Sequence, residues 1–103
     1  MSATIPSSLY RDRYWRPVLH LFKEHPKLNQ CFTTKFFDFS DNTIKVQSLQ
    51  RNAGPWSNSE KIMLKLAFHL FNERYKFNLS DLDYLDDYNK KLAFDAMKMR
   101  FTN

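Results

Sequence analysis

Glycine and cysteine are almost absent from this chain of 103 residues, and each scarcity excludes a class of site. Gly54 is the only glycine, so the chain has no glycine-rich loop that could hold a phosphate group. Cys31 is the only cysteine, so no disulfide can form within the chain, and a reducing compartment is compatible with this. One cysteine and three histidines are too few, and too badly spaced, for a structural zinc site.

The chain also lacks a long apolar run. No segment reaches the roughly 18 consecutive apolar residues that a membrane-spanning helix needs. The first residues, Met1 to Thr4, do not resemble a signal peptide. We therefore expect a cytoplasmic protein without membrane contact. The length corresponds to one domain, residues 8–103, preceded by a flexible tail of residues 1–7.

Positive charge and aromatic side chains are abundant. The formal net charge is +5, and aromatic residues make up 17% of the chain, including 10 phenylalanines. Aromatic side chains provide large apolar surfaces for a core. The excess of positive charge favours anionic partners but does not specify a fold.

A capped apolar segment from Ser57 to Tyr75 predicts the central helix of the fold. Ser57 and Glu60 have the spacing of a capping box, in which each side chain accepts a hydrogen bond from the other residue's backbone N–H. Apolar residues cover about two thirds of the helical circumference, so the rest of the chain has to pack around this helix. One polar wedge remains, formed by Lys61, Lys65, His69 and Asn72.

Residues Ser8 to Glu24 carry apolar side chains at helical spacing, which predicts a first helix. Pro17 lacks a backbone N–H and clashes with the preceding turn, so two alternatives stay open. Either the helix is kinked at Pro17, or it begins near Asp12 to Arg16 with Pro17 in its first turn. Pro26 favours an end near Glu24.

The remaining segments predict a hairpin and a last helix. Phe36–Phe39 and Thr43–Leu49 are β-prone and flank the turn residues Ser40–Asn42. A short helical turn is expected near 81–84, and a longer helix from about Asp86 to Phe101. The predicted fold is α+β, with three main helices around a central apolar helix and one small β-hairpin.

The predicted last helix carries two apolar lines. Phe94, Met97 and Phe101 follow one another at i, i+3 and i+7, on a different side from the expected core stripe. If this line is exposed, it marks a partner surface, and if the hairpin or the first helix covers it, it is core. We take Phe94, Met97, Phe101 and Lys90 as the candidate partner-binding residues, together with basic residues of the first helix. The expected core stripe consists of Leu85, Tyr88, Leu92, Ala96 and Met99.

An alternative function is direct binding of nucleic acid. Arginine and aromatic residues alternate from Tyr10 to Arg16, as they do where phosphates and bases are contacted together. The structural interpretation is favoured over this one: the aromatics pack inward while the arginines face solvent. No helix-turn-helix, zinc-finger or RNA-recognition motif is present. The residues for this nucleic-acid or anion site are Arg11, Arg13, Arg16, Trp15, Lys61, Lys65 and His69.

Catalytic and metal chemistry find little support. In the acidic segment 81–87, Asp86 and Leu92 stand where a calcium loop needs glycine and glutamate, and helix capping explains these carboxylates adequately. Nothing in the sequence places Cys31 beside His20, His25 or His69 as a nucleophile and base. We predict no enzymatic activity, no cofactor and no metal.

Four parts of the sequence form a recognisable set: Phe36-Phe37-Asp38-Phe39 through Ile44-Lys45, Trp56, Leu64 through Asn72, and Leu85-Asp86-Asp87-Tyr88-Asn89 running to Arg100-Phe101. Together they resemble a group of small uncharacterised proteins from phages, prophages and other mobile elements of Gram-positive bacteria. This group tends to have a glycine after the position of Asn72. Glu73 stands there in this chain, so the central helix is expected to continue for another turn.

The resemblance implies a setting and no catalytic residue. Small proteins from mobile elements often bind and disable a host factor or a defence nuclease. The leading hypothesis is therefore a small binding protein that acts by protein–protein contact, with a host or defence protein as its partner. Nucleic-acid binding is the alternative, and formation of a homodimer stays open.

Overall fold

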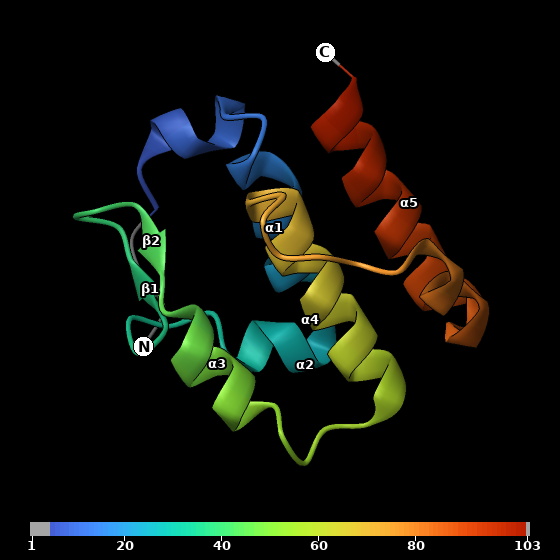
Figure 1. Cartoon of the computed structure of the whole chain (residues 1–103). Helices are drawn as coiled ribbons and strands as arrows, with labels where there is room; N and C mark the ends of the chain where they lie inside the picture. The colour runs from blue at the N-terminus through green and yellow to red at the C-terminus, as the bar shows by residue number, and fades with distance from the viewer. Residues whose placement is uncertain (1–4, 103) are drawn as a thin grey trace.

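Helices make up most of the fold, and one small antiparallel hairpin completes it (Figure 1). The computed structural model describes residues 5–102. It confirms the predicted α+β class. In chain order the elements are the 3₁₀ helix η1 (Ser7–Arg11), α1 (Trp15–Glu24), α2 (Pro26–Gln30), β1 (Phe37–Asp38), β2 (Thr43–Ile44), α3 (Val46–Asn52), α4 (Asn58–Phe71), the 3₁₀ helix η2 (Leu79–Tyr84) and α5 (Asp87–Phe101).

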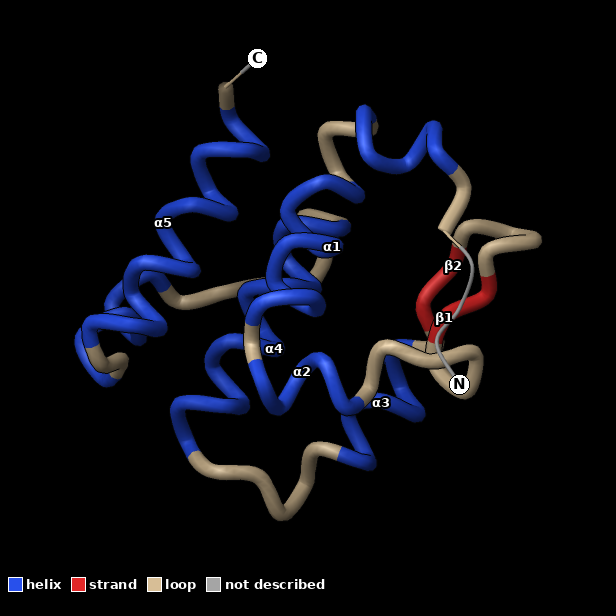
Figure 2. The backbone as a smooth tube through the Cα atoms, turned by 180° about the vertical axis from the view of Figure 1, so that it is seen from behind, coloured by secondary structure: helices blue, strands red, loops and turns tan. Residues whose placement is uncertain are grey.

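Three long helices, α1, α4 and α5, pack against one another at the centre of the fold. The helix α4 also contacts α2 and η2, as expected for a helix that is apolar around most of its circumference. The hairpin and α5 lie on opposite sides of the α1–α4 pair, in the view of Figure 1 and from behind in Figure 2. This arrangement leaves one long side of α5 at the edge of the molecule.

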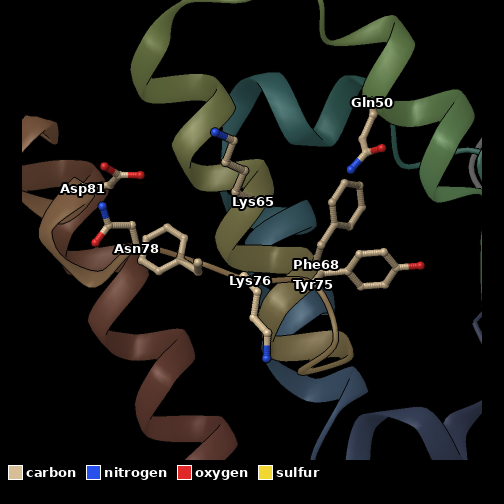
Figure 3. Close-up of a pocket in the computed structure, with 8 residues that line it drawn as sticks. Gln50, Lys65, Phe68, Tyr75, Lys76, Asn78 and Asp81 are labelled. Carbon is tan, nitrogen blue, oxygen red and sulfur yellow. The ribbon is translucent and has the colours of Figure 1, made fainter.

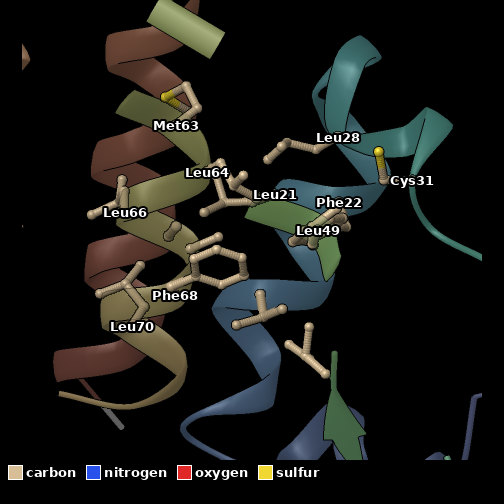
Figure 4. Packing of buried hydrophobic residues seen from close by; sticks show 14 of the residues in the cluster. Leu21, Phe22, Leu28, Cys31, Leu49, Met63, Leu64, Leu66, Phe68 and Leu70 are labelled. Atoms are coloured by element: carbon tan, nitrogen blue, oxygen red, sulfur yellow. The ribbon is translucent and has the colours of Figure 1, made fainter. Parts of the chain in front are cut away.

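The buried core has an aliphatic part and an aromatic part. Figure 4 shows Leu64 of α4 directed toward Leu21 of α1, with Leu66 directed to the other side of α4. Under the hairpin, the ring of Phe37 meets the rings of Phe22 and Phe32 edge to face, at centroid distances of 4.9 and 5.0 Å. Such edge-to-face pairs stabilise a core beyond the area that they bury.

The capping box predicted for the central helix is confirmed. Ser57 Oγ accepts from the backbone N–H of Glu60 at 3.3 Å, and Glu60 Oε1 accepts from the backbone N–H of Ser57 at 2.9 Å. The two hydrogen bonds satisfy donors that the start of a helix would otherwise leave unpaired.

The predicted continuation of this helix to Tyr75 is wrong, because α4 ends at Phe71. Asn72 has an extended backbone, and its Oδ1 accepts from the backbone N–H of Arg74 at 3.1 Å. The chain then turns back, and the ring of Tyr75 lies against that of Phe68 with centroids 5.9 Å apart. The asparagine ends the helix without a glycine, because its side chain forms the hydrogen bonds of a turn.

The first helix follows the second of the two alternatives. It begins at Trp15, and Pro17 lies in its first turn, where the missing N–H leaves no intrahelical bond unmade. Asp12 Oδ1 accepts from the backbone N–H groups of Tyr14 at 2.8 Å and Trp15 at 3.1 Å, and this fixes the start. The helix ends at Glu24, as predicted.

The short helix α2 was not predicted. Pro26 ends α1 and also occupies the first position of α2, where its fixed φ favours helix. The N-cap of α2 is His25, whose Nδ1 accepts from the backbone N–H groups of Lys27 at 3.2 Å and Leu28 at 3.4 Å. Histidine therefore performs here the role that serine or aspartate usually has.

The predicted hairpin is present, but its second strand is much shorter than expected. Phe37 pairs with Ile44 and Asp38 pairs with Thr43. The prediction of a strand to Leu49 is wrong, because the chain enters α3 at Val46. Val46, Leu49 and Ala53 are buried at i, i+3 and i+7, so the helical spacing determines the structure of this segment.

The N-terminal segment contacts the core from Ile5 onward. Residues 1–4 of the expected tail 1–7 lie outside the described residues. Ile5 is partly buried against the core, η1 begins at Ser7, and Leu9 is buried.

Candidate partner-binding surface

The helix α5 begins at a well-formed cap. Asp86 is the N-cap residue, and its Oδ1 accepts from the backbone N–H of Asn89 at 2.8 Å. The helix then runs to Phe101, so the predicted segment Asp86–Phe101 is confirmed. Tyr88 Oη donates to the backbone carbonyl of Glu24 at 2.8 Å, which ties the start of α5 to the end of α1.

The packed face of α5 consists mainly of small and polar residues. Ala93 and Ala96 are fully buried, and Asn89 and Arg100 are more than nine-tenths buried on the same side. Of the predicted core stripe, Leu85, Leu92 and Ala96 are buried, whereas Tyr88 is 52% exposed and Met99 is half-buried. Small residues allow α5 to approach α1 closely, so this face needs few large side chains.

The side of α5 next to this packed face carries the candidate partner-binding residues. Phe94 is 56% exposed and Phe101 is 66% exposed, with the partly buried Met97 between them. Lys90, one turn before Phe94, is half-buried. Helical spacing brings Lys90, Phe94, Met97 and Phe101 to one side, which we call the outer stripe. Neither the hairpin nor α1 covers its two phenylalanines.

Lysine side chains surround the outer stripe. Lys91 and Lys98 are exposed on the same helix. Within residues 5–102, Lys91 Nζ and Asp95 Oδ2, 3.0 Å apart, form the only ion pair. Lys90 and Lys98 therefore place positive charge beside the phenylalanine rings and form no ion pair among residues 5–102.

Arg100 connects the outer stripe to α1. Its guanidinium carbon lies 4.3 Å from the ring centroid of Tyr14 and 4.8 Å from that of Phe101. Its Nη1 is buried and has no hydrogen-bond partner among the described residues. The aromatic faces stabilise the cation in place of a carboxylate. Sequence analysis missed Arg100, although its spacing from Ala93 and Ala96 places it on the packed face.

The residues of the nucleic-acid alternative lie in two separate places. Trp15 is only 5% exposed and packs among Phe37, Phe39 and Phe71, so its indole cannot stack on a base in this conformation. Arg11 and Arg13 are exposed, and Arg16 is half-buried. Arg16 lines a pocket of about 180 Å³, here named the α1 pocket, formed by Tyr10, Arg16, Leu19, His20, Lys23 and Met99.

The basic residues of α4 lie at a different groove. Lys61 and Lys65 line a depression beside α3, which continues into a groove of about 450 Å³ around Phe68 (Figure 3). The amino groups of Lys65 and Lys76 point in different directions, and Asp81 lines the same groove. His69 is half-buried, and its Nδ1 lies 2.8 Å from the carbonyl oxygen of Tyr75. The positive groups therefore do not converge on one point in this groove.

The sulfhydryl and imidazole groups have structural surroundings. Cys31 is buried, and this burial raises the pKa of its thiol. Its Sγ lies 3.5 Å from Asn52 Nδ2, and no histidine among the described residues is hydrogen-bonded to it. Burial also lowers the pKa of His25 below its ordinary value of 6.5. A neutral thiol without a base beside it is a poor nucleophile.

Two further observations concern residues 5–102. No group of three or more histidine, cysteine, aspartate or glutamate side chains in this range is arranged to hold a metal ion. None of its helices has the length and apolar character needed to cross a bilayer.

Comparison with protein-family models, with curated proteins and with solved structures gives no match. Function therefore has to be inferred from the surface chemistry of the chain itself.

Proposed function

We propose that this protein is a small non-enzymatic binding protein that acts by protein–protein contact through the outer stripe of α5. The supporting observation is the exposure of Phe94 and Phe101, with Met97 between them, on a helix whose other side is packed. Aromatic and methionine side chains are enriched at the centres of protein interfaces. Their spacing of i, i+3 and i+7 suits a helix that docks in an apolar groove of its partner.

The charge beside the stripe indicates the chemistry of the partner. Lys90, Lys91 and Lys98 flank the phenylalanines, so the groove that receives them is expected to have an acidic rim. In such an interface the rings supply most of the affinity. The lysines mainly increase the rate of association and favour the correct orientation.

The resemblance to small proteins of mobile elements supports a host or defence factor as the partner. A defence nuclease is one example, and it would be blocked where the outer stripe covers its surface. The net charge of +5 argues against imitation of nucleic acid, because a protein that imitates nucleic acid needs negative charge.

The first test is affinity purification of the tagged protein from a Gram-positive lysate, with and without nuclease treatment. We expect a protein partner that survives nuclease and is lost with Phe94→Asp. The matched control is Tyr84→Asp, because Tyr84 is 69% exposed and belongs to η2. Both variants are expected to keep the melting temperature of the wild type, since substitutions at exposed positions change stability by only about 0.5 kcal/mol.

Three results would contradict the proposal. Recovery of nucleic acid alone, with every protein lost on digestion, would favour the nucleic-acid alternative. Equal loss of the partner with Phe94→Asp and Tyr84→Asp would show that binding does not depend on the outer stripe. A stable dimer in sedimentation experiments that Phe94→Asp dissociates would identify a second copy of the chain as the occupant of the stripe.

A further inference from the structure

The α1 pocket is a second feature of the surface, distinct from the outer stripe. It lies where η1, α1 and α5 meet. Arg16, His20 and Lys23 follow one another at i, i+4 and i+7, so they lie along one side of α1. Tyr10 contributes from η1, and Leu19 and Met99 form the apolar part of the lining. Met99 is on a different side of α5 from Phe94 and Phe101.

Arg16, Lys23 and the Tyr10 hydroxyl bring hydrogen-bond donors to the lining of the α1 pocket. Lys23 Nζ donates to Tyr10 Oη at 2.8 Å and lies 4.5 Å from the centre of its ring. The hydroxyl proton of Tyr10 is thereby left free to be donated elsewhere. A guanidinium has donors only, so Arg16 cannot accept a hydrogen bond from Lys23 or from the Tyr10 hydroxyl. His20 Nε2 is buried and has no hydrogen-bond partner among the described residues.

No acceptor in the described part of the chain matches these donors. Asp95 of α5 is close enough to His20 to interact with it electrostatically, and it also forms the ion pair with Lys91. Arg16 and Lys23 have no carboxylate within ion-pair distance among residues 5–102. Two cationic side chains, Arg16 and Lys23, thus line one pocket without a carboxylate of the described residues to pair with. This lining favours a ligand that is anionic and accepts hydrogen bonds.

We infer that the α1 pocket binds a phosphate group. A phosphate has acceptor oxygens in a tetrahedral arrangement, so it can receive hydrogen bonds from Arg16, Lys23 and the Tyr10 hydroxyl from different directions. A carboxylate has only two oxygens in one plane. The volume of about 180 Å³ fits one phosphate and a few water molecules, each of which takes about 30 Å³. The remainder of a larger ligand would lie outside the pocket.

The experiment is a titration of the full chain with inorganic phosphate at constant ionic strength, followed by two-dimensional NMR. We expect the shift changes to concentrate on Tyr10, Arg16, His20 and Lys23. Arg16→Gln is expected to weaken binding about tenfold, because it removes a charge-assisted hydrogen bond. Lys23→Gln is a second variant at an exposed position, for which we expect a loss of similar size.

The matched control is Arg13→Gln. Arg13 carries the same charge and lies three residues before Arg16, but it is exposed and does not line the pocket. We expect a change in phosphate affinity of less than about twofold, because salt screens a distant exposed charge. The dispersion of each NMR spectrum shows whether the variant is folded. Equal weakening by Arg13→Gln and Arg16→Gln would overturn the inference, as would shift changes spread evenly over Lys61, Lys65 and the other lysines.

A short DNA duplex distinguishes the two sources of the phosphate group. If the pocket receives a nucleic-acid backbone, the duplex binds with a log–log salt slope of roughly −0.9 for each phosphate contact. Arg16→Gln then weakens duplex binding more than Arg13→Gln. If inorganic phosphate binds and the duplex does not, the site takes a free phosphate or a small phosphate ester. Failure of both probes to affect the pocket residues would refute phosphate binding, whatever the result for the outer stripe.

Discussion

The helices α4 and α5 have nearly equal lengths, 14 and 15 residues, and both pack against α1. They bury opposite kinds of side chain. The helix α4 buries large apolar residues such as Met63, Leu66 and Phe68. The helix α5 buries alanines on its packed face and directs Phe94 and Phe101 into solvent.

Under the proposed function, α4 stabilises the core and α5 carries the surface that binds the partner. The large side chains of α4 are removed from water by folding, and this removal stabilises the core. The phenylalanines of α5 remain largely exposed, so their apolar surface can still be buried against a partner. The small face of α5 attaches it closely to α1, which holds the outer stripe on a rigid support.

The largest effect should come from truncating matched residues of the two helices. Leu66 is 1% exposed, so Leu66→Ala is expected to lower the free energy of unfolding by about 2–5 kcal/mol. Phe94→Ala removes a larger side chain but should change the free energy of unfolding by only about 0.5 kcal/mol, because the ring is already in water. Urea denaturation of both variants measures this contrast, and equal losses would show that the stripe is part of the core.

The next effect tests the close contact between α5 and α1. Ala96 is fully buried, so Ala96→Leu must push the helices apart and is expected to cost about 1–3 kcal/mol. The control is Lys98→Leu, which adds an apolar side chain at an exposed position of the same helix. Thermal unfolding of the two variants should differ clearly. If Ala96→Leu is tolerated as well as the control, the contact between α1 and α5 is looser than the structure indicates.

A smaller and nearly equal effect is expected at the starts of the two helices. Ser57→Ala removes the cap of α4, and Asp86→Ala removes the cap of α5. Each should cost about 1 kcal/mol, because a cap satisfies local backbone donors whatever the helix packs against. Urea denaturation is again the measurement. A much larger loss for Asp86→Ala would mean that α5 depends on its cap because its packed face is weak.

The smallest effect concerns His25, which shares a cavity lining with Ser57 and Glu60 near α4 and Asn89 of α5. Burial lowers its pKa below 6.5, although Glu60, Asn89 and Asp86 act in the opposite direction. The unfolded chain then binds the proton more readily than the folded protein. Stability is therefore full above the unfolded pKa of 6.5 and decreases as the pH falls through this value toward the lower folded pKa.

His25→Asn tests the origin of this pH dependence. Asparagine keeps a side-chain acceptor for the cap of α2 but does not titrate. Between neutral pH and about pH 5, the melting temperature of the variant should decrease less than that of the wild type. Glu60 should not confuse the result, because the backbone N–H of Ser57 holds its pKa below the ordinary 4.5. If the melting temperatures of the two proteins decrease equally over this pH range, His25 is not the titrating group.

The parts of the fold that depend on local chemistry could be predicted from the sequence. The capping box at Ser57 involves neighbouring residues and was predicted. The first-turn position of Pro17 was one of the two alternatives that the local sequence left open. The secondary structure of the segment after Ile44 could not be predicted, because Val46 and Leu49 fit a strand or a helix in so short a run. The end of α4 was missed because the turn at Asn72 is stabilised by Tyr75, which packs back on Phe68.

The candidate site was predictable only in part. Helical spacing placed Phe94, Met97 and Phe101 on one side, but spacing alone cannot say which of two apolar sides is covered. The packed face depends on Ala96, which the expected core stripe contained, and on Ala93, which it did not contain. The α1 pocket joins Tyr10, His20 and Met99 from three elements, so only the tertiary structure brings it together.

The burial of Cys31 gives the protein a natural reporter of its own local opening. The thiol is 4% exposed, and burial raises its pKa, so a thiol reagent can react only when the segment between α2 and β1 opens. Because Cys31 is the only cysteine, every modified molecule records an opening at this place. The ratio of its reaction rate to that of a free thiol then gives the equilibrium between closed and open forms, without any engineered label.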